Sequence, residues 1–246
     1  MNTKNSSNVM MNVFLILTII SLSSCCLSRP SVSKNNINAL IAPYENKLGE
    51  SRQILLVVDN SNIFFTKRIV YVLEKRAGIW QMAFEPINAV IGKNGFAPFG
   101  EKREGDGRTP SGIFALRQTF GYNESISAKM PYRQALDNDI WIDDANADDY
   151  NRWVKKEETF AKSYERMKRG DDLYKYGIVI EYNTDPVIKG HGSAIFFHVW
   201  RGENITTAGC VAVSEENIIK ILGWLAPEAR PLIMMGIENK NWRIDL

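Results

Sequence analysis

The residues of this chain that could carry out chemistry are gathered in one stretch, residues 191–214, which reads HGSAIFFHVWRGENITTAGCVAVS. It contains both histidines of the protein, His191 and His198, and Cys210, the one cysteine outside the extreme N-terminus. A thiol and an imidazole suffice for nucleophilic acyl transfer, because the thiolate attacks while the imidazole takes and returns a proton. The stretch therefore predicts a cysteine-dependent active site.

The two histidines differ in their sequence surroundings. His198 follows the apolar run 194–197, so it lies at or near the end of a predicted strand, which would hold its ring firmly enough to act as a base. A histidine on a strand is also a common core group, and spacing alone does not bring it to the thiol. His191 lies in a glycine-flanked turn, KGHGS, where a loose surface position is expected. We predict His198 as the general base and His191 as a bystander.

The sequence around Cys210 favours a reactive thiol. Gly209 permits a sharp turn that exposes the sulfur, and the amides of Gly209 and Cys210 can point at a developing oxyanion. An imidazole beside the thiol would lower its pKa and supply thiolate near neutral pH. Metal binding is a poorer interpretation, because one cysteine and two histidines give at most three ligands with no fourth evident. No metal and no cofactor are predicted.

The N-terminus predicts export. Residues 13–22 form an apolar run that would rise roughly 15 Å as a helix, about half of the hydrocarbon core, which suits a signal peptide rather than a membrane span. The segment LSSC, which ends at Cys25, resembles the bacterial lipobox, in which the cysteine is acylated and becomes the new N-terminus. The resemblance implies an export signal over residues 1–24 and a lipid on Cys25 that anchors the protein to a membrane. An ordinary cleaved signal peptide is the alternative.

Composition indicates an ordinary globular protein. The chain has 246 residues, of which 45% are hydrophobic and 24% charged, enough for one domain or two. The formal net charge of +2 is far too small for an electrostatic nucleic-acid binder, so no nucleic-acid partner is predicted. Residues 25–50 are polar and rich in turn formers, and we expect them to form a tether between lipid and domain. Residues 51–246 are expected to form the catalytic domain.

The order of the apolar runs predicts a mainly β, β-rich α+β domain. Runs rich in Val, Ile, Phe and Tyr begin at Gln53 and are separated by turn residues, which favours antiparallel strands. Residues 92–114 are rich in glycine and charge, and we predict a loop with special backbone angles. A phosphate-binding loop would need GK[ST] and a following helix, neither of which is evident.

Two helices are predicted within this β framework. Residues 153–169 place aromatic residues and Met167 on one face at helical spacing, which predicts an inserted helix. A C-terminal helix should start after Ser214 as N-cap, with two glutamates in its first turn. The acidic residues at 143–149 lack the glycine and terminal glutamate of a calcium loop, and a solvated loop is expected there.

The motif around Cys210 resembles the YkuD-type L,D-transpeptidase catalytic domain, with EGDGRTPSGIF upstream and DDYNRWV and YGIVIEYN between; the resemblance runs from about Gln53 to the C-terminus. In that family a cysteine attacks the bond after the third residue of a peptidoglycan stem peptide, forms a thioester and passes the acyl group to an amine or to water. The resemblance implies a YkuD-like antiparallel β-sandwich. It also implies Cys210 as nucleophile, His198 as base and acid, Thr207 as the [ST] position and Gly209 as the glycine before the thiol.

The motif departs from the family pattern at three points. Ala208 stands where many members have His, Ala212 where many have Arg or Asn, and the interval from His198 to Cys210 is short. The resemblance thus implies a divergent branch of the family, and three activities stay open: an L,D-transpeptidase, an L,D-carboxypeptidase or other hydrolase, and an inactive wall-binding lipoprotein. Retention of His198 and Cys210 argues against the last. The expected partners are peptidoglycan stem peptides in the cell envelope, on the periplasmic side.

Overall fold

The computed structural model of this chain describes residues 34–59 and 67–236, besides Met1. The chain divides into two compact units, residues 1–31 and 32–246, and every helix and strand below belongs to the second. The predicted export signal and Cys25 lie outside the described residues. Among the residues that are described, no helix is both long and apolar enough to cross a bilayer.

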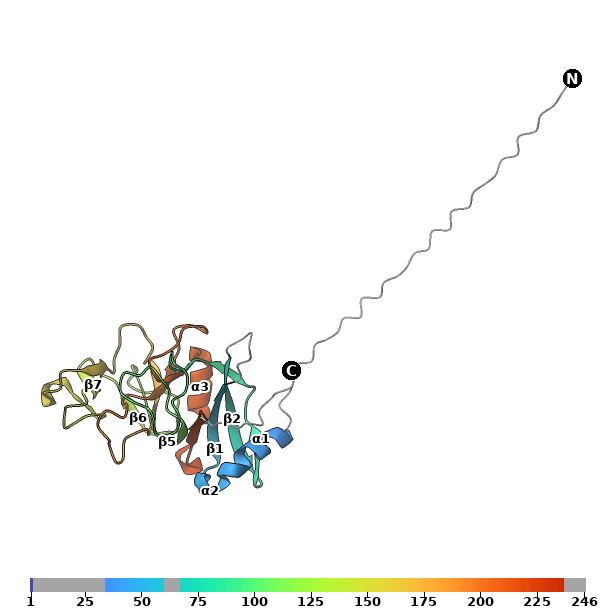
Figure 1. Cartoon of the computed structure of the whole chain (residues 1–246), viewed down its shortest axis with the longest axis horizontal. Coiled ribbons are helices and arrows are strands. Elements are labelled where there is room, and N and C mark those ends of the chain that lie inside the picture. The colour runs from blue at the N-terminus through green and yellow to red at the C-terminus, as the bar shows by residue number, and fades with distance from the viewer. Residues whose placement is uncertain (2–33, 60–66, 237–246) are drawn as a thin grey trace. The chain divides into compact units, whose positions relative to one another are not determined.

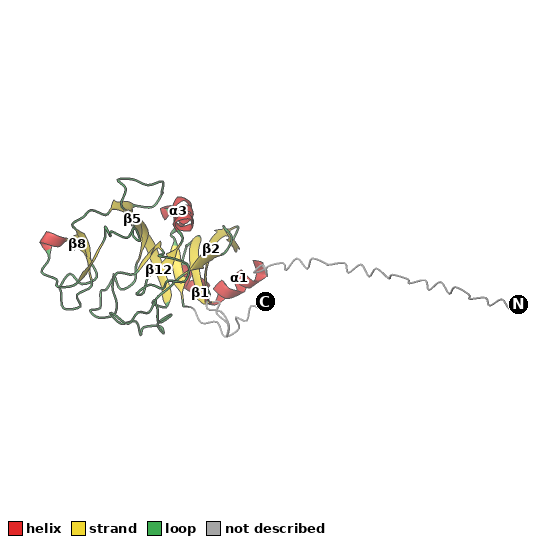
Figure 2. Cartoon of the chain, turned by 90° about the horizontal axis from the view of Figure 1, so that it is seen from above, coloured by secondary structure: helices red, strands yellow, loops and turns green. Residues whose placement is uncertain are grey.

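A curled ten-stranded sheet forms the body of the second unit (Figures 1 and 2). Its strands are β1 (Gln53–Asp59), β2 (Arg68–Arg76), β3 (Ile79–Met82), β4 (Ile87–Ala89), β5 (Gly112–Gly121), β6 (Tyr132–Gln134), β10 (Tyr176–Ile180), β11 (Phe196–Val199), β12 (Val211–Val213) and β13 (Leu232–Met235). They run in the order β12-β11-β10-β5-β13-β1-β2-β3, with β4 beside β2 and β6 beside β5. Three pairs are parallel, β1 with β13, β5 with β6 and β11 with β12, and the others are antiparallel. The predicted mainly β fold is confirmed.

A second sheet replaces the helix that we predicted over residues 153–169. It consists of β7 (Asp139–Ile142), β8 (Trp153–Lys155) and β9 (Tyr164–Arg166) in the order β8-β7-β9, with a short 3₁₀ helix, η2 (Lys156–Glu158), after β8. The helix prediction was wrong because tertiary pairing overrides the helical spacing. Both edges of β7 are paired, and the buried carboxylate of Asp139 accepts a hydrogen bond from Trp153 Nε1 at 2.9 Å.

The expected tether includes a folded segment. Residues 34–48 form α1 (Lys34–Ile41), the 3₁₀ helix η1 (Ala42–Tyr44) and α2 (Glu45–Leu48). Ile37, Ile41 and Leu48 are buried against one face of β1 and β2, and Asn38 exchanges two hydrogen bonds of 3.0 Å with the backbone of Trp80. The tether prediction was wrong for these residues. The segment is mostly polar, but its few apolar side chains lie on one face and are buried against the sheet.

The predicted C-terminal helix is present as α3 (Glu215–Trp224), followed by η3 (Pro227–Ala229). The hydroxyl of Ser214 accepts a hydrogen bond from the amide of Asn217 and caps the helix, as the sequence predicted. Alternate residues of β1 and β2 point to opposite faces of the sheet, so one set packs with α3 and the other with α1. Figure 2 shows these two helices on opposite sides of the strands.

A third cluster of buried side chains lies beside the site. Phe196 is at its centre, with Phe120, Trp141 and Tyr174 packed edge-on around it at ring-centroid distances of 5.0 to 5.5 Å. Such edge-to-face contacts fix ring positions as well as burying area. Cys210 belongs to the same cluster, so the thiol is held by an aromatic core.

We expect α1 to contribute to the stability of the domain. Replacement Ile41→Ala leaves a cavity where the side chain is fully buried, and should lower the free energy of unfolding by about 2–5 kcal/mol. Urea denaturation measures the change. Asn46→Ala, at an exposed position of α2, is the matched control and should leave stability nearly unchanged. Equal midpoints for the two variants would show that the segment is a tether after all.

Candidate active site

The parallel pairing of β11 with β12 brings the predicted nucleophile and base to one face. His198 lies opposite Ala212, and Cys210 directly precedes β12. Phe197 and Val211 face the core under α3, so by strand alternation His198 and Cys210 face the other side. Both then line one cleft of about 440 Å³. The pair predicted from the sequence is therefore brought together by the fold.

The thiol of Cys210 is buried and protonated at rest. Its Sγ accepts a hydrogen bond from the amide of Phe196 and donates one to the carbonyl of Ala194, both at 3.3 Å. Burial raises the pKa of Cys210 to about 12, against the opposing effect of the Phe196 amide. The predicted lowering of this pKa was wrong, because burial of the sulfur outweighs the favourable contacts. A thiolate at this position would require transfer of the proton to a base.

The imidazole of His198 is neutral and oriented. Its Nδ1 lies 2.7 Å from the carbonyl oxygen of Val199. A carbonyl can only accept, so Nδ1 carries the proton and Nε2 is the nitrogen that can take one. Burial lowers the pKa of His198 to about 4, although the Val199 carbonyl opposes this shift. The ring of Tyr174 packs edge-on against the imidazole at 5.1 Å and fixes its plane.

A hydroxyl holds the turn that leads to the thiol. Thr207 Oγ1 donates to the carbonyl of Cys210 at 2.6 Å and accepts from the amide of Gly209 at 3.1 Å. The Gly209 amide is thus engaged within the turn and, in this conformation, does not point at a developing oxyanion as we predicted. Glycine is needed there for another reason. A Cβ on Gly209 would lie 3.0 Å from the carbonyl oxygen of Arg108.

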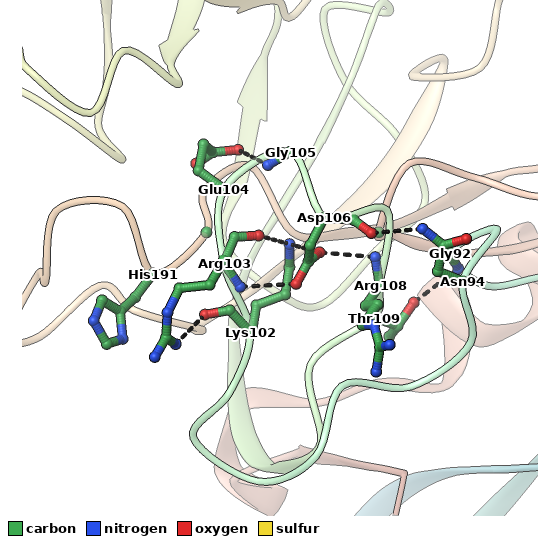
Figure 3. Close-up of polar contacts among 12 residues, drawn as sticks. Gly92, Asn94, Lys102, Arg103, Glu104, Gly105, Asp106, Arg108, Thr109 and His191 are labelled. Atoms are coloured by element: carbon green, nitrogen blue, oxygen red, sulfur yellow. Dashed lines mark hydrogen bonds and ion pairs between the residues drawn. The ribbon is translucent and has the colours of Figure 1, made fainter.

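The glycine-rich loop predicted at 92–114, part of which is drawn in Figure 3, packs against this turn. The amide of Thr207 donates to Ile91 O at 2.9 Å, and Gly92 forms a parallel bridge with Thr207. The amide of Gly92 donates to Thr109 Oγ1 at 2.9 Å, where a Cβ on Gly92 would meet Gly107 O at 2.5 Å. The special backbone angles are confirmed by glycines with positive φ, such as Gly107 at 67°. The loop therefore packs against the turn that leads to Cys210 and holds it through backbone hydrogen bonds.

Comparison with known protein families identifies the domain. The YkuD family, the L,D-transpeptidase catalytic domain, matches residues 54–234. This chain belongs to that family. Among curated proteins nothing matches. Among solved structures, the helical cell shape determining protein Pgp2 from Campylobacter jejuni is similar at 15% identity and a TM-score of 0.43, over 78% of this chain and 50% of that one. The chain thus spans about half the length of Pgp2.

Charged side chains of this YkuD domain that were not predicted as site residues also line the cleft. They are Lys102, Glu104, Asp143, Glu165, Arg169 and Arg201. One sign of them was visible in the sequence, namely the charged residues between the glycines of the loop. The acidic run at 143–149 was expected to be solvated, yet Asp143 lines the cleft and burial raises its pKa.

The second histidine of the YkuD domain, His191, does not line the cleft. Its backbone carbonyl accepts a hydrogen bond from the hydroxyl of Tyr182. Within the described ranges, no group of three or more His, Cys, Asp or Glu residues could hold a metal ion.

The lowered pKa of His198 predicts a stability that depends on pH. The unfolded chain binds a proton at this imidazole below about pH 6.5, but the folded protein does so only below about pH 4. The contribution to stability is therefore complete above pH 6.5 and is lost as the pH falls toward 4, by on the order of 3 kcal/mol. Urea denaturation across this interval should show a shallower pH dependence for His198→Gln than for the wild type. Identical dependences would contradict the assignment.

Proposed function

We propose that this YkuD domain is a cysteine-dependent acyltransferase, an L,D-transpeptidase that acts on peptidoglycan stem peptides. The observation that carries the proposal is that Cys210 and a neutral, oriented His198 line one cleft from adjacent parallel strands. A base in this protonation state can accept the proton of the thiol at neutral pH. Membership of the family supports the substrate class.

The acyl-enzyme forms in two steps. The Sγ proton of Cys210 passes to Nε2 of His198, and the sulfur attacks the carbonyl carbon of the scissile peptide bond, whose electron pair moves to its oxygen. When this tetrahedral intermediate collapses, the carbon–nitrogen bond breaks and the departing amine takes the proton from His198. A thioester remains on Cys210. An incoming amine then loses a proton to His198, attacks the thioester carbon, and the thiol of Cys210 is restored.

Water in place of the amine would make the same site an L,D-carboxypeptidase, and this hydrolase is the second candidate. It uses the same two side chains and differs in what the acceptor side of the cleft admits. The third candidate is a wall-binding protein without activity. The orientation of His198 by Val199 and Tyr174 supports the two catalytic candidates over this one, because a purely structural histidine does not need to line a cleft together with a thiol.

We further propose that the protein is an exported lipoprotein of the cell envelope, with a signal peptide over residues 1–24. The support is the sequence LSSC after an apolar run, and the location of peptidoglycan outside the cytoplasm. Metabolic labelling with palmitate should mark the wild-type protein and leave Cys25→Ala unlabelled. Equal labelling of both proteins would exclude Cys25 as the modified residue.

The activity is tested by incubating the protein with purified muropeptides and identifying the products by mass spectrometry. Crosslinked dimers indicate transpeptidation, and shortened stems indicate hydrolysis. Cys210→Ala should abolish both while the domain stays folded, because the nucleophile is lost and the cavity is small. His198→Ala should slow acylation by on the order of 100-fold, the usual scale for a lost general base.

The controls separate chemistry from folding. Circular dichroism should give the same spectrum for the wild type and Cys210→Ala, and His191→Ala should keep full activity because His191 does not line the cleft. Turnover by Cys210→Ala at the wild-type rate would end the catalytic proposal. Unchanged muropeptides after incubation with the wild type would favour the inactive wall-binding protein.

A further inference from the structure

One buried cation shares the cleft with the nucleophile. Lys102 is 4% exposed and lines the same cleft as Cys210. Its Nζ donates to the carboxylate of Asp106 at 2.6 Å and to the carbonyl of Arg103 at 2.7 Å (Figure 3). A lysine is seldom buried to this extent without a partner. The loop therefore holds the ammonium in one position and compensates its burial.

The ion pair of Lys102 and Asp106 is oriented. Lys102 lines the cleft and Asp106 does not. The carboxylate of Asp106 is fixed on the loop side by the amides of Arg103 and Arg108, both at 2.8 Å. An ammonium has three N–H groups, and two of them are used within the loop. The pair thus places its cationic residue on the cleft side and its carboxylate on the loop side.

A positive charge in the cleft would favour loss of the proton from the neutral thiol of Cys210. Burial raises its pKa, and among the charged groups around it Glu165 raises this pKa further while Arg169 and Lys102 lower it. His198 and Tyr174 line the same cleft without a charge. Arg169 donates to the carboxylates of Glu165 and Asp171, which oppose its field. Lys102 has one carboxylate partner, which does not line the cleft, whereas Arg169 has two, and one of them, Glu165, lines it.

We propose that Lys102 acts through Cys210 by stabilising the negative charge that develops on Sγ when its proton leaves. The inference rests on the proposed function in taking Cys210 as the nucleophile. Lys102 stays protonated throughout, while the proton of the thiol goes to His198. A fixed charge in a cleft shielded from water acts more strongly than it would in bulk solvent.

Alkylation of Cys210 tests this without any peptidoglycan substrate. The full chain is treated with iodoacetamide, which is neutral, or iodoacetate, which is an anion; the sulfur–carbon bond forms, iodide leaves and the thiol proton is released. Mass spectrometry of the peptide containing Cys210 gives each rate between pH 6 and 9. For Lys102→Met we expect alkylation about tenfold slower with iodoacetamide, and a lower ratio of iodoacetate to iodoacetamide rates.

Two further variants fix the interpretation. Lys189→Met removes a lysine that pairs with Asp148 at the surface, outside the cleft, and should leave both rates unchanged. Asp106→Asn retains hydrogen-bond acceptance but removes the counter-ion of Lys102, so it should speed alkylation. A purely structural ion pair would make Lys102→Met and Asp106→Asn change the rate in the same direction.

The outcomes are decisive even if Lys102→Met does not fold, which circular dichroism would reveal. Lys102→Arg keeps the charge and should keep the wild-type ratio of iodoacetate to iodoacetamide rates. Asp106→Asn should raise this ratio. The proposal would be overturned if Cys210 were alkylated at the wild-type rate in Lys102→Met, or more slowly than in the wild type in Asp106→Asn. Muropeptide turnover is measured separately, so an inactive wild type with these alkylation rates would refute the proposed function and leave the role of Lys102 standing.

Discussion

The pairing of β11 with β12 is the constraint on which the site depends. These two strands are short and parallel, and their register places His198 and Cys210 on one face with the aromatic cluster around Phe196. The Phe196 amide and the Ala194 carbonyl then hold the sulfur from the backbone. A shift of one residue in this register would send the thiol or the imidazole into the core under α3, because side chains alternate across a strand.

Burial sets the chemistry of this pair. It disfavours the charged forms of both groups, so the resting site contains a thiol and a neutral imidazole rather than an ion pair. The imidazole can therefore accept a proton, while the thiol keeps its own. The hydrogen bond from Nδ1 of His198 to the Val199 carbonyl fixes the tautomer of the imidazole through a backbone oxygen.

The glycine-rich loop packs directly against the site. It passes so close to the turn before Cys210 that Gly92 has no room for a Cβ and Gly209 has little, and it carries Thr109, whose hydroxyl accepts from the amide of Gly92. The same loop carries Lys102, which lines the cleft and is paired with Asp106. One segment thus packs against the turn and places a buried cation in the cleft.

The sequence by itself determined the mainly β fold, the helix capped by Ser214 and the two residues most suited to acyl transfer, because these depend on local pattern and on the rarity of His and Cys. Only the tertiary structure decided that residues 153–169 form strands, since that segment gains its hydrogen bonds from β7. It also decided that the amide of Gly209 is engaged and that Lys102 lines the cleft. Protonation states depend on burial, which arises from contacts between segments far apart in the chain.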